Sequence, residues 1–206
     1  MSEIANFAAV DLGASGGRVV LGQFDGARWH LDELHRFVNR PVSLAGHLHW
    51  DVLSLWAEIK TGLARYVADF DSPLAGIGVD TWGVDFGLLD AAGHLIGNPY
   101  HYRDQRTDGM VERACQLVPS RRIFQETGVQ FMQLNTLYQL LSMAEANDPH
   151  LEIADTLLMI PDLFHYWLSG RKASESTNAS TTQMLDCRRG SWSCLLYTSP
   201  SPRDRS

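Results

Sequence analysis

Hydrophobic and polar residues alternate in three stretches near the N-terminus, at residues 7–12, 18–24 and 29–37. Because alternate side chains of a strand point to opposite faces, this pattern predicts three consecutive strands. The turn at 13–17 joins the first two. From Asp51 to Val67, apolar residues recur at helical spacing, which predicts a helix with Asp51 as its N-cap. The stretch "AGIGVDTWGVDFGLLD" predicts two further strands, one on each side of 81–83.

Beyond residue 103 the hydrophobic pattern becomes helical. Helical spacing extends over four segments, at residues 104–117, 120–127, 134–147 and 162–168. Gly170 supplies a stop signal for the last of them. We find no internal repeat in this order of elements. The predicted order is a three-stranded meander, a helix, two more strands and then four helices. This order indicates an α/β protein with one layered domain and a helical insertion.

The composition of the 206 residues is that of an ordinary globular protein, with 45% hydrophobic and 20% charged residues. A formal charge of −7 argues against a nucleic-acid partner, because binding phosphates requires a basic surface. No apolar run is long enough to cross a membrane, and the N-terminus lacks the pattern of a signal peptide. Three cysteines without metal-ligand spacing make no disulfide framework. We therefore expect a cytoplasmic protein that acts on a small polar ligand.

The C-terminal segment "CLLYTSPSPRDRS", residues 194–206, has no helical or strand period and is crowded with Ser, Pro and Arg. It resembles the in-frame translation of a sequencing adaptor, and such segments are excluded from fold reasoning. An ordinary disordered terminus is the alternative. We expect residues 1–193 to be the native part of a protein that was cut short. Residues 194–206 are then a non-native, disordered tail that packs against nothing.

The stretch "AVDLGASGGR" places a carboxylate, Asp11, directly before a glycine-rich turn. Its glycines allow positive φ angles and close approach of a ligand, and successive N–H groups can form an anion nest. A carboxylate beside a phosphate needs a cation between them, most simply hydrated Mg²⁺, and Arg18 can contact a phosphate oxygen. Neither the Gly-Lys-Ser/Thr loop nor GxGxxG is present. The turn therefore suits a metal–nucleotide, with a tight hairpin as the alternative.

The same stretch resembles the first phosphate-binding motif of the FGGY carbohydrate kinases, which share a superfamily with actin and Hsp70. Five further motifs follow in the family's order: "VDTWGVDFGLLD", "YHYRDQRTDGM", "GVQFMQLNTLYQL", "LLMIPDLFHYWLSG" and "ESTNASTTQ". The resemblance extends over residues 8–183. It implies a truncated, ribonuclease H-like N-terminal domain of an ATP- and Mg²⁺-dependent sugar kinase. The TWGVDF stretch is most similar to the branch that phosphorylates the ketose L-rhamnulose, and fuculose, xylulose or glycerol kinases are the alternatives.

The resemblance also assigns residues to ligands. It implies that the backbone of Gly83 contacts the sugar, with Trp82, Asp104 and Arg106 as further candidates. Asp11 is expected to hold Mg²⁺ through water, on the charge argument given for the turn. Physically, a glycine lets a hydroxyl approach the main chain, and an indole offers an apolar wall to a deoxy-sugar's methyl group. The ATP phosphates are expected at Ala14, Ser15, Gly16, Gly17 and Arg18.

Each sugar candidate has a purely structural alternative. Trp82 fits a core position equally well, and Asp104 and Arg106 can pair with each other or cap a helix. The family's Trp-x-Asp-x-Arg pattern is altered here, because Tyr102 and Arg103 precede Asp104 and no Trp stands two places before it. The Asp and Arg positions remain matched.

Other polar residues near these motifs have open roles. Asp80 and Asp85 can hold sugar hydroxyls or be satisfied structural carboxylates. Helix capping is the simplest role for Asn135 and Thr136. Among the eight histidines, which show no metal spacing, His101 is nearest to the expected sugar site.

The resemblance places the catalytic base, an aspartate, in a C-terminal domain that this chain lacks. No catalytic residue is therefore expected here, and we expect the chain alone to be inactive. Two other classes of function compete with a kinase. One is a ribonuclease H-like nuclease with two metals on Asp11, Asp80 and Asp85, which the acidic charge disfavours. The other is a non-catalytic ATP-binding module of the actin type, which leaves the sugar motifs unexplained.

Overall fold

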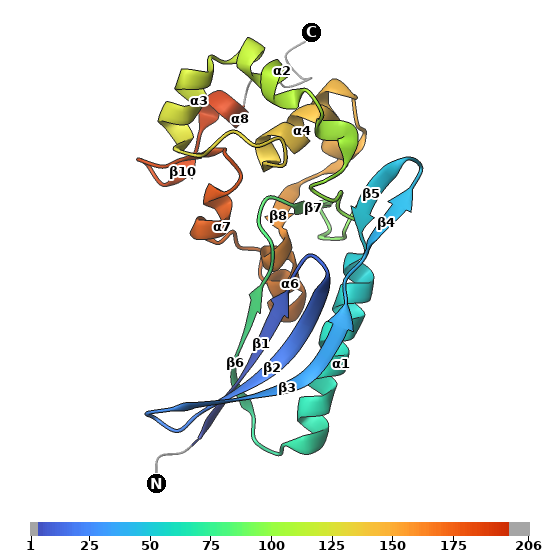
Figure 1. Cartoon of the computed structure of the whole chain (residues 1–206), viewed down its shortest axis with the longest axis vertical. Helices are drawn as coiled ribbons and strands as arrows, with labels where there is room; N and C mark the ends of the chain where they lie inside the picture. Colours follow the sequence, from blue (N-terminus) through green and yellow to red (C-terminus); the bar gives the residue numbers. More distant parts are fainter. Residues whose placement is uncertain (1–3, 198–206) are drawn as a thin grey trace.

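A four-stranded sheet forms the lower half of the molecule in Figure 1, in a computed structural model that describes residues 4–197. Its strand order is β3-β2-β1-β6. The first three strands form the antiparallel meander that the alternating pattern predicts, and β6 lies parallel to β1 on the other side. The bounds are β1 (Ala5–Leu12), β2 (Gly16–Phe24), β3 (Trp29–Val38) and β6 (Leu74–Asp80).

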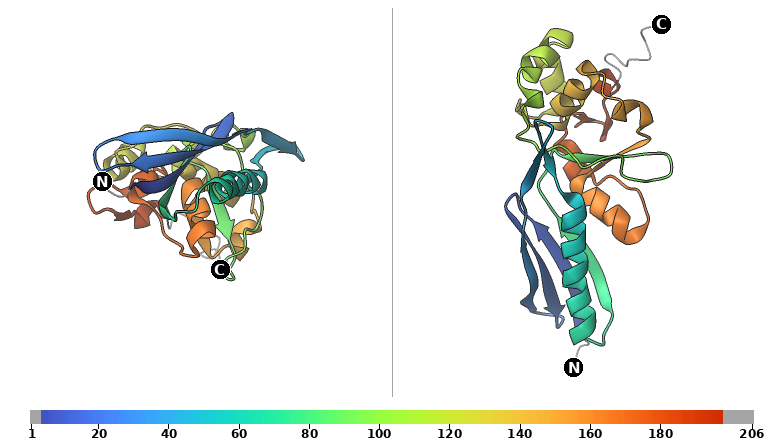
Figure 2. Two further views of the ribbon diagram at one scale, coloured as in Figure 1. Left: turned by 90° about the horizontal axis from the view of Figure 1, so that it is seen from below. Right: turned by 90° about the vertical axis from the view of Figure 1, so that its right-hand side faces the viewer.

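One face of this sheet is covered by helix α1 (Val52–Asp69), which confirms the helix predicted there. Asp51 is its N-cap and accepts a hydrogen bond of 3.0 Å from the amide of Ser54. Gly62 lets α1 approach closely, because a Cβ at this position would overlap the side chain of Val19. Helix α6 (Ile160–Ser169) joins the same core cluster as α1. Figure 2 shows both helices on one side of the sheet, and no helix of the described residues covers the other side.

The upper half contains the helical insertion and three small two-stranded sheets (Figure 1). Helices α2 (Met110–Leu117), α3 (Ser120–Thr127) and α4 (Thr136–Glu145) enclose a second core cluster that includes Ile123 and Tyr138. None of the helices among the described residues is both long and apolar enough to cross a membrane. The remaining elements are β4 (Pro41–Leu44), β5 (His47–Trp50), β7 (Phe86–Leu89), η1 (Gln105–Thr107), α5 (His150–Ile153), β8 (Thr156–Met159), α7 (Ser176–Ser180), β9 (Leu185–Asp186), β10 (Ser191–Trp192) and α8 (Cys194–Tyr197).

The single helix predicted over 104–117 is wrong. The segment forms the short 3-10 helix η1 and then α2, and Gly109 between them has a left-handed φ of 76°. A left-handed residue cannot continue a right-handed helix, so the chain turns there. The helix at 120–127 is confirmed to the residue. The one predicted at 134–147 is shorter, at Thr136–Glu145, and α6 is longer than the predicted 162–168.

The expectation that nothing in 194–206 packs against the domain is wrong for its first residues. Cys194–Tyr197 forms helix α8, and Leu196 is only 8% exposed. Its side chain belongs to the core cluster with Ala114, Val118 and Ile123, because an apolar side chain placed beside an apolar surface is driven to cover it. Residues 198–206 lie outside the described residues. The division into a native 1–193 and a non-native tail stays a prediction.

Candidate functional site

The turn between β1 and β2 is held from two sides. The amide of Gly13 donates to the carbonyl of Gly16 over 2.8 Å, which closes the turn. From the end of β3, Asn39 donates its side-chain amide to Gly13 (2.9 Å) and its backbone amide to Ser15 (3.2 Å). Among residues 4–197, nothing accepts a hydrogen bond from the exposed amides of Ala14 and Ser15. The turn therefore offers two free N–H donors, as a phosphate-binding turn requires.

The expectation that glycines 13, 16 and 17 adopt positive φ angles is wrong, since none of them does. Gly16 and Gly17 are required for space instead. A Cβ on Gly17 would overlap the ring of Phe37, and one on Gly16 would lie 3.2 Å from the carbonyl oxygen of Phe37. Strand β3 thus packs directly onto the start of β2, and only glycine fits between them.

Charged residues form one row across all four strands of the sheet. Cross-strand register pairs Arg36 with Arg18, Arg18 with Asp11, and Asp11 with Asp80. Residues that are paired across two strands point to the same face of the sheet. Here this is the face that α1 does not cover. Asp11, Arg18, Arg36 and the turn line a cavity of about 340 Å³.

Arg18 does not stand free in this cavity. Its Nε and Nη2 atoms lie 2.9 and 2.7 Å from Oδ2 of Asp11, with both side chains nearly half exposed. Oδ1 of Asp11 has no hydrogen-bond partner among the described residues. The described residues contain no group of three or more His, Cys, Asp or Glu that could hold a metal. One free carboxylate oxygen fits an Mg²⁺ held through water beside phosphates, and it does not fit a cage built from protein ligands alone.

The two-metal nuclease site does not occur among the described residues. Asp80 is the register neighbour of Asp11, but Asp85 has no exposed surface and is bonded elsewhere. It accepts hydrogen bonds on Oδ2 from the indoles of Trp50 (2.6 Å) and Trp82 (3.0 Å), and on Oδ1 from Gln139 (2.8 Å). Burial raises its pKa to about 6, against the opposite effect of these bonds. Asp85 is therefore a satisfied carboxylate, which was one of the two roles left open.

Four aromatic rings stack beside Asp85 in the order Trp82, Trp50, His101 and Tyr102. Trp50, which has no exposed surface, contacts Trp82 at a centroid distance of 3.9 Å and His101 at 4.1 Å. Tyr102 continues the stack at 4.5 Å from His101 and donates its backbone amide to Asp85. Trp82 and Tyr102 are the partly exposed members, so these two rings can present an apolar wall to a ligand.

His101 is neutral in this stack. Burial lowers its pKa to about 4, and the positive charge of Arg103 acts in the same direction. The amide of Arg103 donates to Nδ1 over 3.0 Å, which leaves the proton on Nε2. A general base at neutral pH requires a titration nearer to neutrality, so the stacking role explains His101 better.

Gly83 lies in the turn that follows β6. Its amide has no acceptor among residues 4–197, so it is available to a ligand, whereas its carbonyl accepts from the amide of Asp85. A Cβ at Gly83 would lie 3.2 Å from Oγ1 of Thr181. The left-handed residue of the turn is Val84, with φ 69°, which is strained for a β-branched side chain. The hydroxyl of Thr136 holds the Val84 carbonyl at 2.6 Å.

Asn135 and Thr136 start α4, but neither side chain caps it. The hydroxyl of Thr136 reaches Val84, and the side-chain amide of Asn135 donates to Gln183 and to the carbonyl of Gln130. The capping role expected for them is wrong. Both side chains tie separate segments together, and such long-range partners leave no local spacing signal in a sequence.

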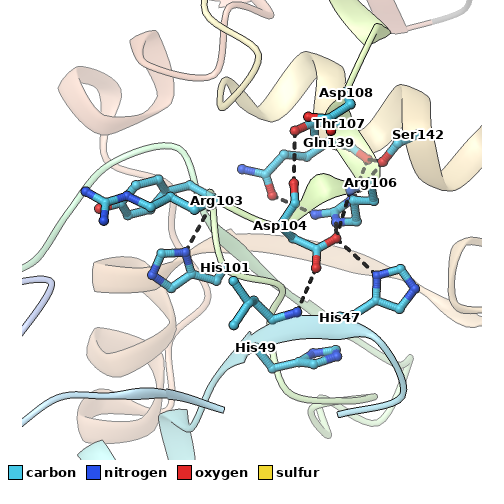
Figure 3. Close-up of polar contacts among 12 residues, drawn as sticks. His47, His49, His101, Arg103, Asp104, Arg106, Thr107, Asp108, Gln139 and Ser142 are labelled. Carbon is cyan, nitrogen blue, oxygen red and sulfur yellow. Dashed lines mark hydrogen bonds and ion pairs between the residues drawn. The ribbon is translucent and has the colours of Figure 1, made fainter. Parts of the chain in front are cut away.

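Asp104 is buried and bonded to the protein on both oxygens (Figure 3). Oδ2 accepts from the amide of Leu48 at 2.6 Å, and Oδ1 accepts from the amide of Arg106 at 3.0 Å and contacts His47 at 3.1 Å. Burial alone would raise the pKa of Asp104, but the bonds from Leu48 and His47 hold it below its usual value. The carboxylate caps η1 and clamps the β4–β5 hairpin, as the capping alternative stated.

Arg106 is paired with Asp104, as the other alternative stated, because its Nε lies 3.9 Å from Oδ1 of Asp104. The rest of its guanidinium group extends toward α4 (Figure 3). Its Nη1 donates to the Gln139 carbonyl (2.7 Å) and the Ser142 hydroxyl (2.9 Å), and its Nη2 to Oε1 of Gln139 (2.7 Å). The guanidinium also lies 4.1 Å from the ring centre of Tyr100. Arg106 therefore joins η1 to α4, and Gln139 links it onward to Asp85. Nε of Arg106 has no hydrogen-bond partner among the described residues, whereas the other polar atoms of the Asp104 and Arg106 side chains are bonded within the protein.

Residues 7–201 match the family model described as the N-terminal domain of the FGGY family of carbohydrate kinases. The chain belongs to this family. The chain is 47% identical over 191 residues to a rhamnulokinase of Pectobacterium atrosepticum, covering 92% of this chain and 38% of that protein. It is 41% identical over 181 residues to a rhamnulokinase of Bacteroides thetaiotaomicron, covering 88% and 37%. The FGGY chain thus spans less than half the length of these curated relatives.

Solved sugar kinases share the fold. A gluconate kinase from Lactobacillus acidophilus superimposes with a TM-score of 0.84 at 16% identity, over 95% of this chain and 39% of that one. A glycerol kinase from Plasmodium falciparum with ADP gives a TM-score of 0.77 at 17% identity, over 96% and 41%. The sugar-kinase N-terminal domain fold expected from the motifs is confirmed for this FGGY chain.

Proposed function

We propose that this chain is the N-terminal part of an ATP- and Mg²⁺-dependent kinase that transfers phosphate to L-rhamnulose, giving L-rhamnulose 1-phosphate. The observation that supports it best is the turn at 13–15, with two free amides beside Asp11 and Arg18 in one open cavity. Relatives named rhamnulokinase at 41 and 47% identity support the choice of ketose. The solved gluconate kinase and glycerol kinase are only 16 and 17% identical to this chain, and they support only the fold.

The proposed phosphate region, the turn at residues 13–17, and the proposed sugar region, at Gly83, lie at the same edge of the sheet. Strands β1 and β6 run parallel, so the turn after β1 and the turn after β6 lie at the same edge. Ala14 and Ser15 would donate to the phosphates, with Arg18 as a cation and Asp11 holding Mg²⁺ through water. The amide of Gly83 would donate to a sugar hydroxyl, with Trp82 as an apolar wall. This arrangement would place acceptor and phosphate side by side, which is the main requirement of phosphoryl transfer.

The chain by itself is expected to be inactive. Near Gly83, Asp80 and Asp85 are the carboxylates that could be considered a base. The oxygens of Asp85 are occupied by indole and amide donors. Asp80 is exposed and is the register partner of Asp11, so it lies on the side of the phosphate turn, where a metal-bound phosphate is proposed. A base has to reach the sugar hydroxyl. We therefore place the base, and the adenosine side of the cleft, in the part of the protein that lies beyond this chain. The cytoplasmic location also stays a prediction.

An ADP-release assay tests the proposal on two proteins. One is the 206-residue chain, and the other is a chimera of residues 1–193 with the remaining part of the Pectobacterium atrosepticum rhamnulokinase. We expect no turnover by the chain and L-rhamnulose-dependent turnover by the chimera. Turnover by the chain alone would contradict the two-domain argument. A chimera that prefers L-fuculose or D-xylulose would contradict the choice of L-rhamnulose.

A further inference from the structure

The turn at residues 13–17, the proposed phosphate turn, is held in place by strand β3 as well as by β1 and β2, which it joins. The ring of Phe37 packs onto Gly17, and Asn39 donates two hydrogen bonds to the turn. These contacts fix the C-terminal end of β3 beside the free amides of Ala14 and Ser15. Any side chain at this end of β3 that points to the open face of the sheet therefore lines the same cavity.

Arg36 is such a side chain. It is the register partner of Arg18 on β2, and it lines the cavity of about 340 Å³ with Asp11 and the turn. Directly opposite side chains on antiparallel strands lie roughly 5 Å apart at Cβ, and like charges there repel. The two arginines lie side by side at a turn with unbonded amides, and each is paired with an exposed carboxylate, Arg18 with Asp11 and Arg36 with Glu33. The repulsion between their guanidinium groups is relieved when an anion lies between them.

A β-bulge gives Arg36 an exchangeable partner. The register of β2 and β3 shifts between Val19 and Val20, so that Glu33 and Arg36 reach the same face although three positions separate them. Arg36 donates from Nε to Glu33 Oε1 over 2.9 Å, and its Nη2 contacts Oε2. Arg36 is 64% exposed, so a ligand in solution can reach this bidentate ion pair. A phosphate offers the same two-oxygen geometry as the Glu33 carboxylate with more negative charge, and it can therefore compete with Glu33 for the guanidinium group.

We propose that Arg36 is a second phosphate-binding residue of this site, which exchanges Glu33 for polyphosphate oxygens and acts together with Arg18 and the amides of Ala14 and Ser15. The proposal rests on the proposed function, since it takes the turn as a phosphate site. It adds β3 to a site that the motif alone confines to β1, β2 and the turn between them.

Calorimetric titration of the 206-residue chain with inorganic tripolyphosphate at low ionic strength tests this role without the adenosine cleft. The variants are Arg36→Gln, Arg18→Gln and Glu33→Gln. Arg28→Gln is the matched control, because Arg28 lies in the turn at the opposite end of the β2–β3 hairpin. Melting temperatures verify that each variant is folded.

We expect Arg36→Gln and Arg18→Gln each to weaken tripolyphosphate binding about fivefold, since each removes one charge-assisted contact. Glu33→Gln should tighten binding about twofold, because Arg36 then has no competing carboxylate. If Arg36→Gln matches the Arg28→Gln control while Arg18→Gln weakens binding, the role of Arg36 is wrong and the phosphate turn stands. If the unsubstituted chain binds no tripolyphosphate, the phosphate turn and Arg36 are both wrong.

Discussion

The indole of Trp50 donates a hydrogen bond of 2.6 Å to the carboxylate of Asp85, and neither side chain has any exposed surface. Trp50 ends β5 in the small hairpin, and Asp85 directly precedes β7. The same carboxylate also accepts from Trp82 and Gln139. One buried anion thus holds the hairpin, helix α4 and the turn that carries Gly83 in fixed positions. The candidate sugar wall depends on a residue that does not itself face the ligand.

Asp85 should make the chain more stable as the pH falls from 7 toward 5. Its pKa is raised to about 6 in the folded state, from an ordinary value of 3.8, so the folded protein takes up the proton first. The stabilisation is complete below the ordinary value and is lost as the pH rises through 6. An effect on the order of 1–3 kcal/mol is expected. Urea unfolding followed by tryptophan fluorescence between pH 5 and 8 measures it, and Asp85→Asn should abolish this component of the pH dependence.

His101 should make the chain less stable as the pH falls from 6.5 toward 4, which is opposite to the effect of Asp85. Its folded-state pKa is lowered to about 4 from an ordinary 6.5, so stability is present above 6.5 and is lost as the pH falls toward 4. His101→Gln should therefore make the chain more resistant to acid, whereas Asp85→Asn should make it more sensitive. The same unfolding series on both variants separates the two residues. Parallel pH profiles for the two variants would show that neither group titrates as described.

The elements that the sequence predicted best were those with a regular spacing of hydrophobic residues. The strands β1 to β3 and the Asp51 cap were predicted correctly. In β1 and β2 one buried face imposes a regular period, whereas in β3 only Phe37 is buried. The β4–β5 hairpin was missed because its strands are only four residues long. Its turn residues Ala45 and Gly46 both have positive φ, as a two-residue hairpin turn requires, and Gly46 was the available signal. The turn pair at Asp108 and Gly109 likewise marked the break before α2.

The site was predicted less completely, for a physical reason. Asp11, the phosphate turn and Gly83 lie in short motifs that the sequence displays directly. Apart from the contacts between Asp104 and Arg106, most bonds of these two side chains go to residues 33 to 57 positions away, and those of Asp85 go up to 54 positions away. Only the fold therefore reveals that these residues are occupied. Arg36 belongs to no motif, and it joins the cavity only through the register of β3 with β2.

Replacing Gly83 by Val should destabilise the turn after β6. The new side chain would press on Thr181, whose hydroxyl lies 3.2 Å from the ideal Cβ position, and overpacking of this kind costs about 1–3 kcal/mol. Gly78→Val on the neighbouring strand is the matched control, because nothing lies within 4 Å of a Cβ there. Thermal unfolding of both variants measures the difference, and equal melting temperatures would contradict the contact with Thr181.

In the chimera described above, Gly83→Val should also separate the two ligands. We expect KM for L-rhamnulose to rise while KM for ATP stays within about twofold, because the phosphate turn lies on another pair of strands. An equal rise in both values would indicate general misfolding rather than a sugar contact at Gly83.

The last prediction concerns Leu196, which covers the cluster of Ala114, Val118 and Ile123. If this packing contributes to folding, Leu196→Ala should lower the free energy of unfolding by about 1–3 kcal/mol, less than in a central core position because α8 is a short helix near the end of the chain. Truncation after Ser193 should lower it by at least as much, and Ile153→Ala, at an exposed side chain, is the control. Denaturant unfolding of the three variants decides the matter. An unchanged midpoint for both Leu196→Ala and the truncation would instead favour a tail that is foreign to the domain and contributes nothing to its stability.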